Sequence, residues 1–269
     1  MSKAHEHNRQ RWNEVTPVHI DSVFYDVDGF IGGRDVLGRV EREAVGSVAG
    51  KRLLHLQCHF GMDTLCWARD GASAVVGVDF SDVALAKARD LAERTGMADR
   101  VTFLEADVTR AGKVAGGAFD VIFTSLGTIV WLEDLQGWAD TIAANLAPGG
   151  FFYFLDSHPL AIMFDGEQVE PRVKYPYFHN MEADISPVGE ADYADAAYKV
   201  QHEGHEYSWP LQDIFGVLER AGLTVFEVRE YPFCGWNMFP DMKRAGDGYW
   251  YRQEGATELP LLLGFKAKW

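Results

Sequence analysis

Residues 53–61, Leu-Leu-His-Leu-Gln-Cys-His-Phe-Gly, decide how this chain folds. The apolar run predicts a strand, and the glycine at its end predicts a tight turn into the helix expected at 62–69. A lone acid, Asp79, ends the next apolar segment, and Asp107 follows the third. The chain therefore predicts consecutive strands with a carboxylate at the tip of the second and of the third.

Strands and helices alternate outward from this turn, and several predicted helices are followed by glycine. A glycine just past a helix supplies the left-handed residue that ends it. The expected strands are 52–57, 74–79, 100–105, 119–125 and 151–156, and the expected helices are 62–69, 82–95 and 134–146. Alternation of this length favours a parallel sheet with helices on both faces.

The flanking segments interrupt this alternation and are rich in aromatic residues. Further expected elements are helices at 6–15, 36–45 and 211–221, a hairpin pairing 177–185 with 193–201, and strands at 224–229 and 259–266. We expect four parts: an aromatic N-terminal lid (1–50), a binding core (51–156), a substrate cap inserted after the fifth strand (157–208) and a completion of the sheet (209–269).

Composition narrows the class of protein. A chain of 269 residues, 47% hydrophobic and 24% charged, suits one domain with an insertion. A net charge of −15 without a Lys/Arg stripe makes nucleic acid a poor partner. The apolar runs are shorter than the roughly 20 residues that span a bilayer, and the polar start lacks a signal-peptide core, so we expect a cytoplasmic protein without a membrane partner. The three cysteines are expected to be reduced thiols, and the oligomeric state stays open.

The first turn is the expected binding site, because open parallel sheets bind ligands beyond the carboxyl ends of their strands. Gly61 permits close backbone approach, and the following helix offers free N–H groups to an anion. Asp79 is placed to accept hydrogen bonds from ribose hydroxyls, and Asp107 from an adenine amine. Each acid has an alternative role as a helix cap.

The order of five motifs, Leu54–Gly61, Val78–Ser81, Glu105–Val108, Phe119–Ile122 and Leu146–Gly150, resembles the class I S-adenosylmethionine-dependent methyltransferases. The turn Leu-His-Leu-Gln-Cys-His-Phe-Gly is similar to a bacterial small-molecule subgroup of that family. The resemblance covers about residues 51–156. It implies a Rossmann-like three-layer α/β sandwich, a mostly parallel seven-stranded sheet with an antiparallel last strand, S-adenosylmethionine as cofactor and a small-molecule acceptor methylated on O or N.

The resemblance also implies the cofactor contacts, with one departure. The predicted cofactor-binding residues are Leu56, Gln57, Gly61, Asp79, Phe80, Ser81, Asp107, Val108, Ser125 and Leu126. Most family members have an acid where His55 stands, and that acid helps to hold the methionine ammonium. We expect backbone carbonyls near Leu56 and the Gln57 side chain to replace it, and His55 to be a core residue.

Catalytic residues are less visible, because methyl transfer needs alignment and requires a base only when the acceptor carries its proton. His158, directly after the fifth strand, is the first candidate base, and the alternative is a histidine that bonds loop backbone. Tyr25, from the lid, is a weaker candidate. The run His202-Glu203-Gly204-His205 lacks the spacing of a helical zinc site and indicates no third ligand, so we expect no metal.

Two other functions remain open. A nicotinamide-dependent oxidoreductase shares the strand-turn-helix with an acid on the next strand, but the chain lacks Gly-x-Gly-x-x-Gly. A non-catalytic S-adenosylmethionine-binding module is the other alternative, since a fold does not establish turnover.

Overall fold

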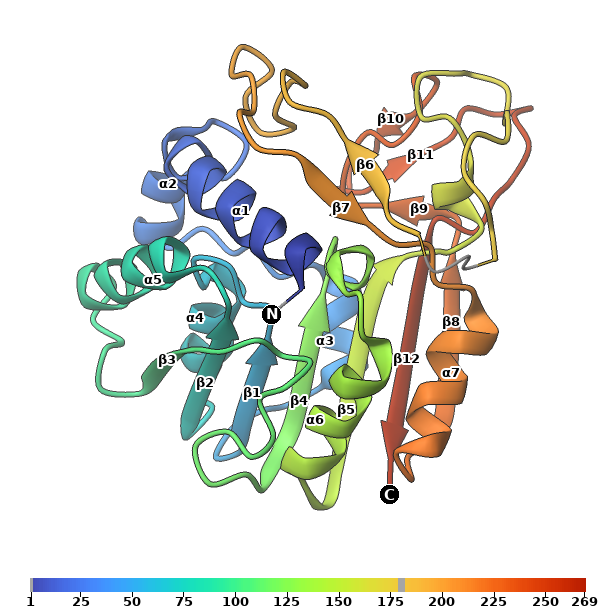
Figure 1. Cartoon of the computed structure of the whole chain (residues 1–269). Helices are drawn as coiled ribbons and strands as arrows, with labels where there is room; N and C mark the ends of the chain where they lie inside the picture. The colour runs from blue at the N-terminus through green and yellow to red at the C-terminus, as the bar shows by residue number, and fades with distance from the viewer. Residues whose placement is uncertain (1, 179–181) are drawn as a thin grey trace.

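A mixed sheet of seven strands lies at the centre of the chain, within the residues that this computed structural model describes, 2–178 and 182–269 (Figure 1). Its strands are β1 (Arg52–Leu56), β2 (Ala74–Asp79), β3 (Val101–Glu105), β4 (Phe119–Ser125), β5 (Leu146–Ser157), β8 (Thr224–Tyr231) and β12 (Leu262–Lys268). Their order is β3-β2-β1-β4-β5-β12-β8. The first five pair in parallel, whereas β12 runs antiparallel to both of its neighbours. The predicted fold class is therefore confirmed.

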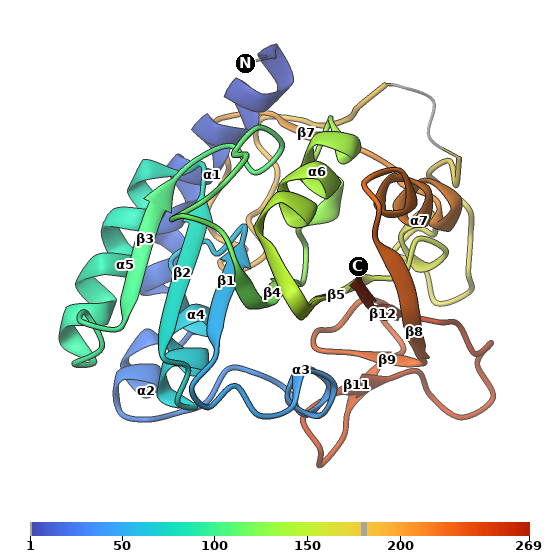
Figure 2. The same ribbon diagram turned by 90° about the horizontal axis from the view of Figure 1, so that it is seen from below.

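Helices cover both faces of the sheet, as Figure 2 shows from below. The helices of the sandwich are α3 (Arg39–Val45), α4 (Met62–Arg69), α5 (Asp82–Arg94), α6 (Leu135–Asn145) and α7 (Leu211–Arg220). Side chains alternate along each strand, so Leu53 packs with α4 and α5 while Leu54 packs with α6 and α7. These two hydrophobic cores hold the strand ends in place at the edge where a ligand is expected.

The lid helix is longer than its sequence suggests. Helix α1 (Lys3–Asp21) begins at Ser2, whose hydroxyl accepts a hydrogen bond from the His5 backbone N–H, and it continues past Pro17. The buried residues Thr16 and His19 anchor its second half against the rest of the chain. Helix α1 crosses the carboxyl edge of β1 and β2, and the short α2 (Val27–Ile31) follows it (Figure 1).

The cap pairs differently from the predicted hairpin. Strand β6 (Asp184–Ser186) pairs with β7 (Gly204–Glu206), so the expected pairing of 177–185 with 193–201 is wrong. Three residues of that expected hairpin, 179–181, lie outside the described residues. Strands this short and polar carry no alternating pattern that would specify their partner.

The C-terminal excursion and two single turns complete the described elements. They are η1 (Ile129–Trp131), η2 (Ala161–Met163), β9 (Phe233–Cys234), β10 (Lys243–Arg244) and β11 (Trp250–Tyr251). Among the helices of the described residues, none combines the length and the apolar character needed to cross a membrane.

Candidate active site

The turn after β1 adopts a glycine-like path although two of its residues carry side chains. Gln57 and His59 have φ angles of 58° and 51°, and Gly61, which caps α4, has a φ of 80°. Left-handed φ is uncommon outside glycine and costs free energy. The backbone of this turn therefore follows a path that glycine usually adopts, and the Gln57 and His59 side chains lie at the edge of the sheet.

Asp79 joins this turn to the end of β2. Its carboxylate accepts hydrogen bonds from the backbone N–H of His59 at 2.8 Å and of Ser81 at 2.9 Å. Burial raises the pKa of Asp79 to about 6, and the backbone donors oppose that shift. A carboxylate has roughly four acceptor sites, so these two bonds leave capacity for hydroxyl donors.

Asp107 has one oxygen in a local turn and one directed at the lid. Its Oδ1 accepts from the Thr109 backbone N–H at 2.9 Å and from the Thr109 hydroxyl at 2.7 Å. Its Oδ2 lies 3.6 Å from His5 Nδ1. The His5 ring also packs edge-on against Phe80, with ring centroids 5.2 Å apart. Asp107, the predicted adenine contact, and Phe80, a predicted cofactor-binding residue, thus face one side chain of α1.

Gln57 presents an unpaired oxygen at the end of β1. Its Nε2 donates to the Thr128 carbonyl at 2.8 Å, and its Oε1 is buried without a hydrogen-bond partner among the described residues. A buried carbonyl oxygen without a donor is costly, so this atom suits a ligand donor. His55, in contrast, is a core residue: Nδ1 lies 2.8 Å from the Thr64 hydroxyl, and burial lowers its pKa to about 3.

Asp156 builds the loop that holds Thr128. Its two carboxylate oxygens accept hydrogen bonds from four backbone N–H groups, those of Gly127, Thr128, Ile129 and Ser157, and from the Thr128 hydroxyl. This buried acid therefore fixes the loop between β4 and η1. The Gln57 amide donates its hydrogen bond to the Thr128 carbonyl of that loop.

Asp63 is a further candidate site residue, which the sequence did not predict. It lies in the first turn of α4 and accepts a hydrogen bond from Ser125 Oγ, at the end of β4, at 3.0 Å. Burial raises the pKa of Asp63 to about 6, with the Ser125 hydroxyl opposing the shift. Because β1 and β4 are the neighbours at which strand order reverses, this pair stands at the crevice of the sheet. Acids are common in the first turn of a helix because they interact favourably with the helix dipole. The position of Asp63 in the sequence therefore does not indicate a role in a binding site.

The remaining predicted cofactor residues line the same edge. Leu56 is buried at the end of β1, Ser81 caps α5 through the Ala84 N–H, and Val108 is buried beside Asp107. Leu126, with a φ of 29°, follows Ser125 and is partly exposed.

An aromatic layer from the lid and the cap covers the β1 turn. The rings of Trp12, His19 and Tyr25 all lie within 6 Å of the His59 ring, centroid to centroid. The Tyr25 hydroxyl lies 2.5 Å from that of Tyr193 in the cap, and burial raises the pKa of Tyr25. Tyr25 is thus a hydroxyl that keeps its proton near neutral pH.

His158 lies buried beyond the end of β5. Its Nδ1 accepts from the Leu160 backbone N–H at 3.0 Å, so its Nε2 carries the proton toward Glu230 Oε1 at 2.9 Å. Burial lowers the pKa of His158, although Glu230 opposes the shift. The loop-backbone bond of the alternative interpretation is present, and Glu230 also orients the ring. Asp156 points to other groups and does not orient this ring.

A cavity of about 170 Å³ lies between α1 and the cap. Its lining residues are Arg11, Trp12, Val15, Trp131, Ser186, Glu190, Ala191, Asp192, Tyr193 and Glu206. Trp12 lies in its wall and also contacts the His59 ring, so the cavity adjoins the covered turn. Three acids against one arginine make its lining acidic.

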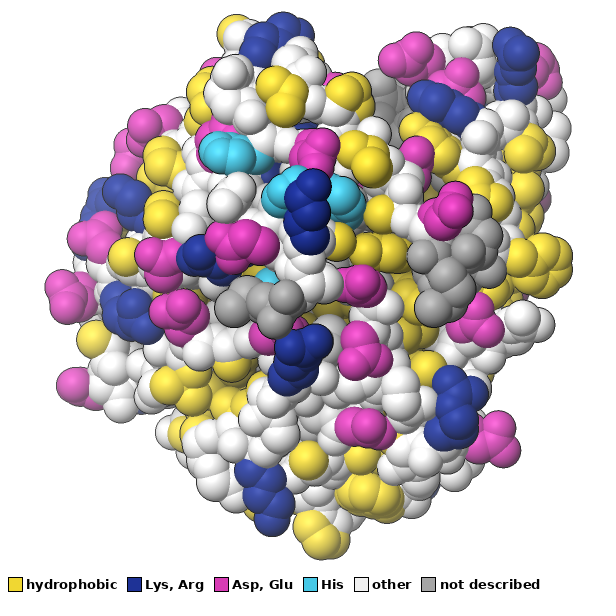
Figure 3. All heavy atoms as spheres, viewed as in Figure 1, with side chains coloured by type: hydrophobic (Ala, Val, Ile, Leu, Met, Phe, Trp, Pro, Cys, Tyr) yellow, Lys and Arg dark blue, Asp and Glu magenta, His cyan; other side chains and the backbone are white. Residues whose placement is uncertain are grey.

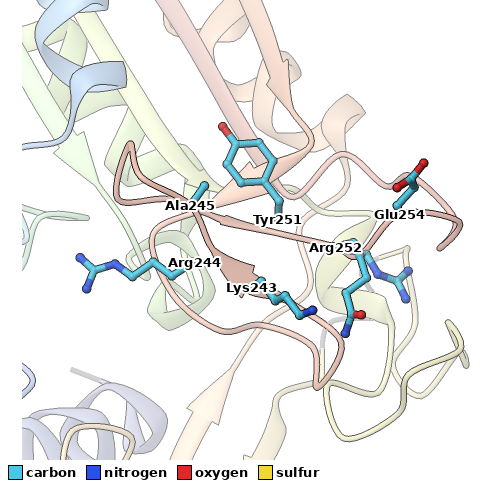
Figure 4. Close-up of a pocket in the computed structure, with 7 residues that line it drawn as sticks. Lys243, Arg244, Ala245, Tyr251, Arg252 and Glu254 are labelled. Carbon is cyan, nitrogen blue, oxygen red and sulfur yellow. The ribbon is translucent and has the colours of Figure 1, made fainter.

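A larger hollow of about 370 Å³ lies on the β10–β11 hairpin, away from the strand ends (Figure 4). Figure 4 shows Lys243 and Arg244 pointing in opposite directions, and Arg252 forms a buried ion pair with Asp241 at 3.1 Å. Its cationic groups do not converge on one point, so this hollow is not the candidate site.

The edge residues fit an adenosine-containing sulfonium. Carboxylates at Asp79 and Asp107 match hydroxyl and amine donors, and the unpaired oxygen of Gln57 matches an ammonium. The aromatic layer matches a sulfonium, because ring faces attract cations.

Comparison with known proteins agrees with this fit. Residues 53–150 match the family model of a methyltransferase domain. The chain is 34% identical over 114 residues to the uncharacterized protein YjhP of Escherichia coli K12, which covers 42% of this chain and 43% of that protein. It is 36% identical over 119 residues to a demethylmenaquinone methyltransferase of Clavibacter sepedonicus, covering 44% and 46%. The chain thus spans less than half the length of these curated relatives.

Solved structures resemble nearly the whole chain. An S-adenosylmethionine-dependent methyltransferase from Mesorhizobium loti superposes with a TM-score of 0.59 at 20% identity, over 85% of this chain and 95% of that one. The glycopeptide N-methyltransferase MtfA superposes with a TM-score of 0.56 at 17% identity, over 90% and 96%. Residues 53–150 are therefore similar to a methyltransferase domain, and the chain has the predicted fold of the class I S-adenosylmethionine-dependent methyltransferases.

Proposed function

We propose that this protein is an S-adenosylmethionine-dependent methyltransferase that acts on an O or N atom of a small-molecule acceptor. The observation that carries the proposal is the buried, unpaired Oε1 of Gln57 at the same sheet edge as the carboxylates of Asp79 and Asp107. These groups match the ammonium, ribose and adenine donors of one ligand. The methyltransferase domain match over residues 53–150 agrees with it.

Each residue at the edge has a role toward the cofactor, which supplies an activated methyl group on its sulfonium. Gln57 accepts from the ammonium, and Asp156 keeps the Gln57 amide in place through the Thr128 loop. Asp79 accepts from the ribose hydroxyls and Asp107 from the adenine amine. The aromatic layer excludes water from the reacting atoms. This helps to align the acceptor with the methyl group and prevents hydrolysis of the cofactor.

The acceptor enters the cavity between α1 and the cap. Glu190, Asp192 and Glu206 give that cavity an acidic lining, in which burial raises the pKa of Glu206 and so reduces its charge, whereas the bond from His19 helps to lower the pKa of Asp192. Acidic walls repel anions, so amines and neutral alcohols fit better than carboxylic acids or phosphates. Trp12 lines the cavity and also contacts the His59 ring of the covered turn, so the acceptor and the cofactor would meet beside it.

A base is needed only for an acceptor that holds its proton, and His158 and Tyr25 remain the proposed candidates. The lone pair of the neutral His158 ring is on Nδ1, where it accepts from the Leu160 N–H, so the ring has to give up that bond before it can take a proton, and Glu230 then stabilises the charged ring. The Tyr25 hydroxyl, which keeps its proton, positions an acceptor as a hydrogen-bond donor.

The geometry weakens one of the two alternatives and does not bear on the other. A dinucleotide pyrophosphate needs close backbone approach at the first turn, where Gln57 and His59 carry side chains at left-handed φ. A non-catalytic binding module retains the cofactor site, so only turnover separates it from an enzyme.

The first test is calorimetric titration of the full chain with S-adenosylmethionine, S-adenosylhomocysteine and NADH, after removal of any ligand carried through purification. We expect both sulfur compounds to bind and NADH not to bind. NADH binding without the sulfur compounds would overturn the proposal. A second step measures S-adenosylhomocysteine formed with panels of small amines, alcohols and carboxylic acids. Cofactor binding without product from any panel would favour the non-catalytic module.

A further inference from the structure

Three side chains that commonly bind metals meet where α1 packs against the cap. His7 comes from α1, Glu203 directly precedes β7, and His205 lies within β7. His7 Nδ1 lies 2.5 Å from Glu203 Oε1 and 3.0 Å from His205 Nε2. His205 Nε2 lies 3.0 Å from the same Glu203 oxygen. The three atoms therefore form a closed triangle.

Hydrogen bonds cannot satisfy all three edges of this triangle. An imidazole nitrogen either carries a proton and donates, or carries a lone pair and accepts. If both nitrogens donate to Glu203, their N–H groups face each other across 3.0 Å. If one nitrogen is unprotonated, its lone pair faces either the carboxylate or another lone pair. While Glu203 is ionised, one edge is repulsive in every arrangement, whereas a single cation satisfies three lone pairs at once.

We propose that His7, Glu203 and His205 bind one divalent transition-metal ion of the zinc class. Two imidazoles and one carboxylate are a usual donor set for zinc, with water as the fourth ligand. Ligand atoms about 2.0–2.2 Å from a tetrahedral zinc ion lie about 3.3–3.6 Å apart, so the two longer edges need to widen by roughly half an ångström and the His7–Glu203 edge by about 1 Å. The sequence around His202–His205 indicates no third ligand, because His7 lies 198 positions from His205.

The surroundings hold the cluster in a defined geometry. Asn8, which is buried, donates to the His205 carbonyl at 2.9 Å and accepts from the His205 backbone N–H at 2.8 Å. This paired contact fixes the β7 backbone to α1 next to His7. The His7 and Glu203 side chains are partly exposed, which leaves access for a water ligand. Histidines gather on this face, over α1 and β7 (Figure 3).

A metal ion at this point would clamp the lid to the cap. His7 is two residues from His5, which faces Asp107 and Phe80 at the cofactor edge. Binding energy gained in the closed arrangement therefore stabilises α1 over the carboxyl ends of the strands. The clamp lies outside the acceptor cavity and takes no part in the methyl transfer itself.

The test uses the full chain, freed of metal by a chelator, titrated with ZnCl₂ in a calorimeter. We expect one equivalent per chain and a melting temperature that rises with zinc concentration. Substitution with Co²⁺ should give the intense visible absorption of a tetrahedral site. Failure of the wild-type chain to bind either ion would overturn the proposal.

Variants assign the ligands. Loss of an outer-shell partner alone costs about 10- to 100-fold in metal affinity, so His7→Ala, Glu203→Gln and His205→Ala should each lose at least that much. His202→Ala is the matched control, because His202 lies on the same loop but pairs with Glu14 at 2.5 Å. Zinc affinity retained in the three variants, or lost equally in the control, would contradict the assignment.

Hydrogen exchange tests the clamp separately from binding. Zinc should slow amide exchange in α1 of the wild-type chain and leave it unchanged in Glu203→Gln, which is expected to fold because the substitution conserves shape. Equal α1 exchange with and without zinc in the wild-type chain would show that the ion does not hold the lid. None of these readouts depends on methyltransferase activity.

Discussion

His5 Nδ1 lies 3.6 Å from Asp107 Oδ2, so the lid helix reaches the carboxylate that the sequence assigns to the adenine amine. The same ring packs against Phe80, another predicted cofactor-binding residue. Burial lowers the pKa of His5, although Asp107 opposes that shift, so the contact is a weak one near neutral pH. We therefore predict that cofactor binding and the position of α1 are coupled.

Removing the His5 ring should strengthen cofactor binding, because the ring competes for Phe80 and Asp107. Weak, partly exposed contacts of this kind are worth about 0.2–1 kcal/mol, so His5→Ala should tighten S-adenosylhomocysteine binding by roughly 1.4- to 5-fold in calorimetry. Gln10→Ala, on the same helix and bonded to Glu6, is the control. Weaker binding by His5→Ala would mean that the ring supports the cofactor instead.

Asp79→Ala should weaken cofactor binding by about 1–3 kcal/mol, the usual loss for hydrogen bonds to a charged group. The variant also removes the acceptor of the His59 and Ser81 N–H groups, so its melting temperature should fall. Asp134→Ala removes a comparable backbone acceptor, at the start of α6, and should lower stability without changing cofactor affinity. Wild-type affinity in a folded Asp79→Ala protein would remove Asp79 from the site.

Gln57→Ala should weaken binding of S-adenosylmethionine by about 1–3 kcal/mol, or roughly 5- to 150-fold, because Oε1 accepts from the ammonium. Methylthioadenosine lacks the ammonium and carboxylate, so its affinity should be unchanged in the same variant. Equal losses for both ligands would show that Gln57 only supports the turn.

Asp63→Asn should change the pH dependence of stability. Burial raises the pKa of Asp63 to about 6 in the folded chain, from 3.8, so the folded state binds this proton more tightly than the unfolded state. The stability that Asp63 contributes is therefore present below about pH 4 and lost as the pH rises to about 6. The asparagine variant should gain stability relative to wild type across that window and keep a constant difference above about pH 7.

Urea unfolding at several pH values measures this difference, with Gln168→Ala, an exposed change without an ionisable group, as the control. A pH-independent difference between Asp63→Asn and wild type would contradict the raised pKa.

His158→Ala should leave cofactor affinity nearly unchanged and slow transfer to an acceptor that needs deprotonation, by about 10²- to 10⁴-fold for a general base. Steady-state rates across pH, with calorimetry on the same preparation, measure both. Because His158 also bonds Leu160 and Glu230, the variant's melting temperature should fall. A lower melting temperature with an unchanged rate would assign the ring to loop structure alone.

The core around the first turn was predictable because its signals are local. The expected bounds of α4, β2 and β4 match the structure residue for residue, those of β1, α5 and β3 differ by one position, and β5 begins five residues before its expected start. Hydrophobic periodicity, terminal glycines and an acid after an apolar run all act within a few residues. The positions of Asp79 and Asp107 at the carboxyl edge followed from that pattern.

The sequence by itself thus determined the alternating sheet and the acids at its edge, and tertiary structure decided the rest. Asp63 meets Ser125 across 62 positions, and His7 meets His205 across 198. The β6–β7 pairing likewise joins short polar segments that specify no register on their own. Contacts between residues so far apart depend on how the lid and cap pack over the sheet, and no local pattern encodes that packing.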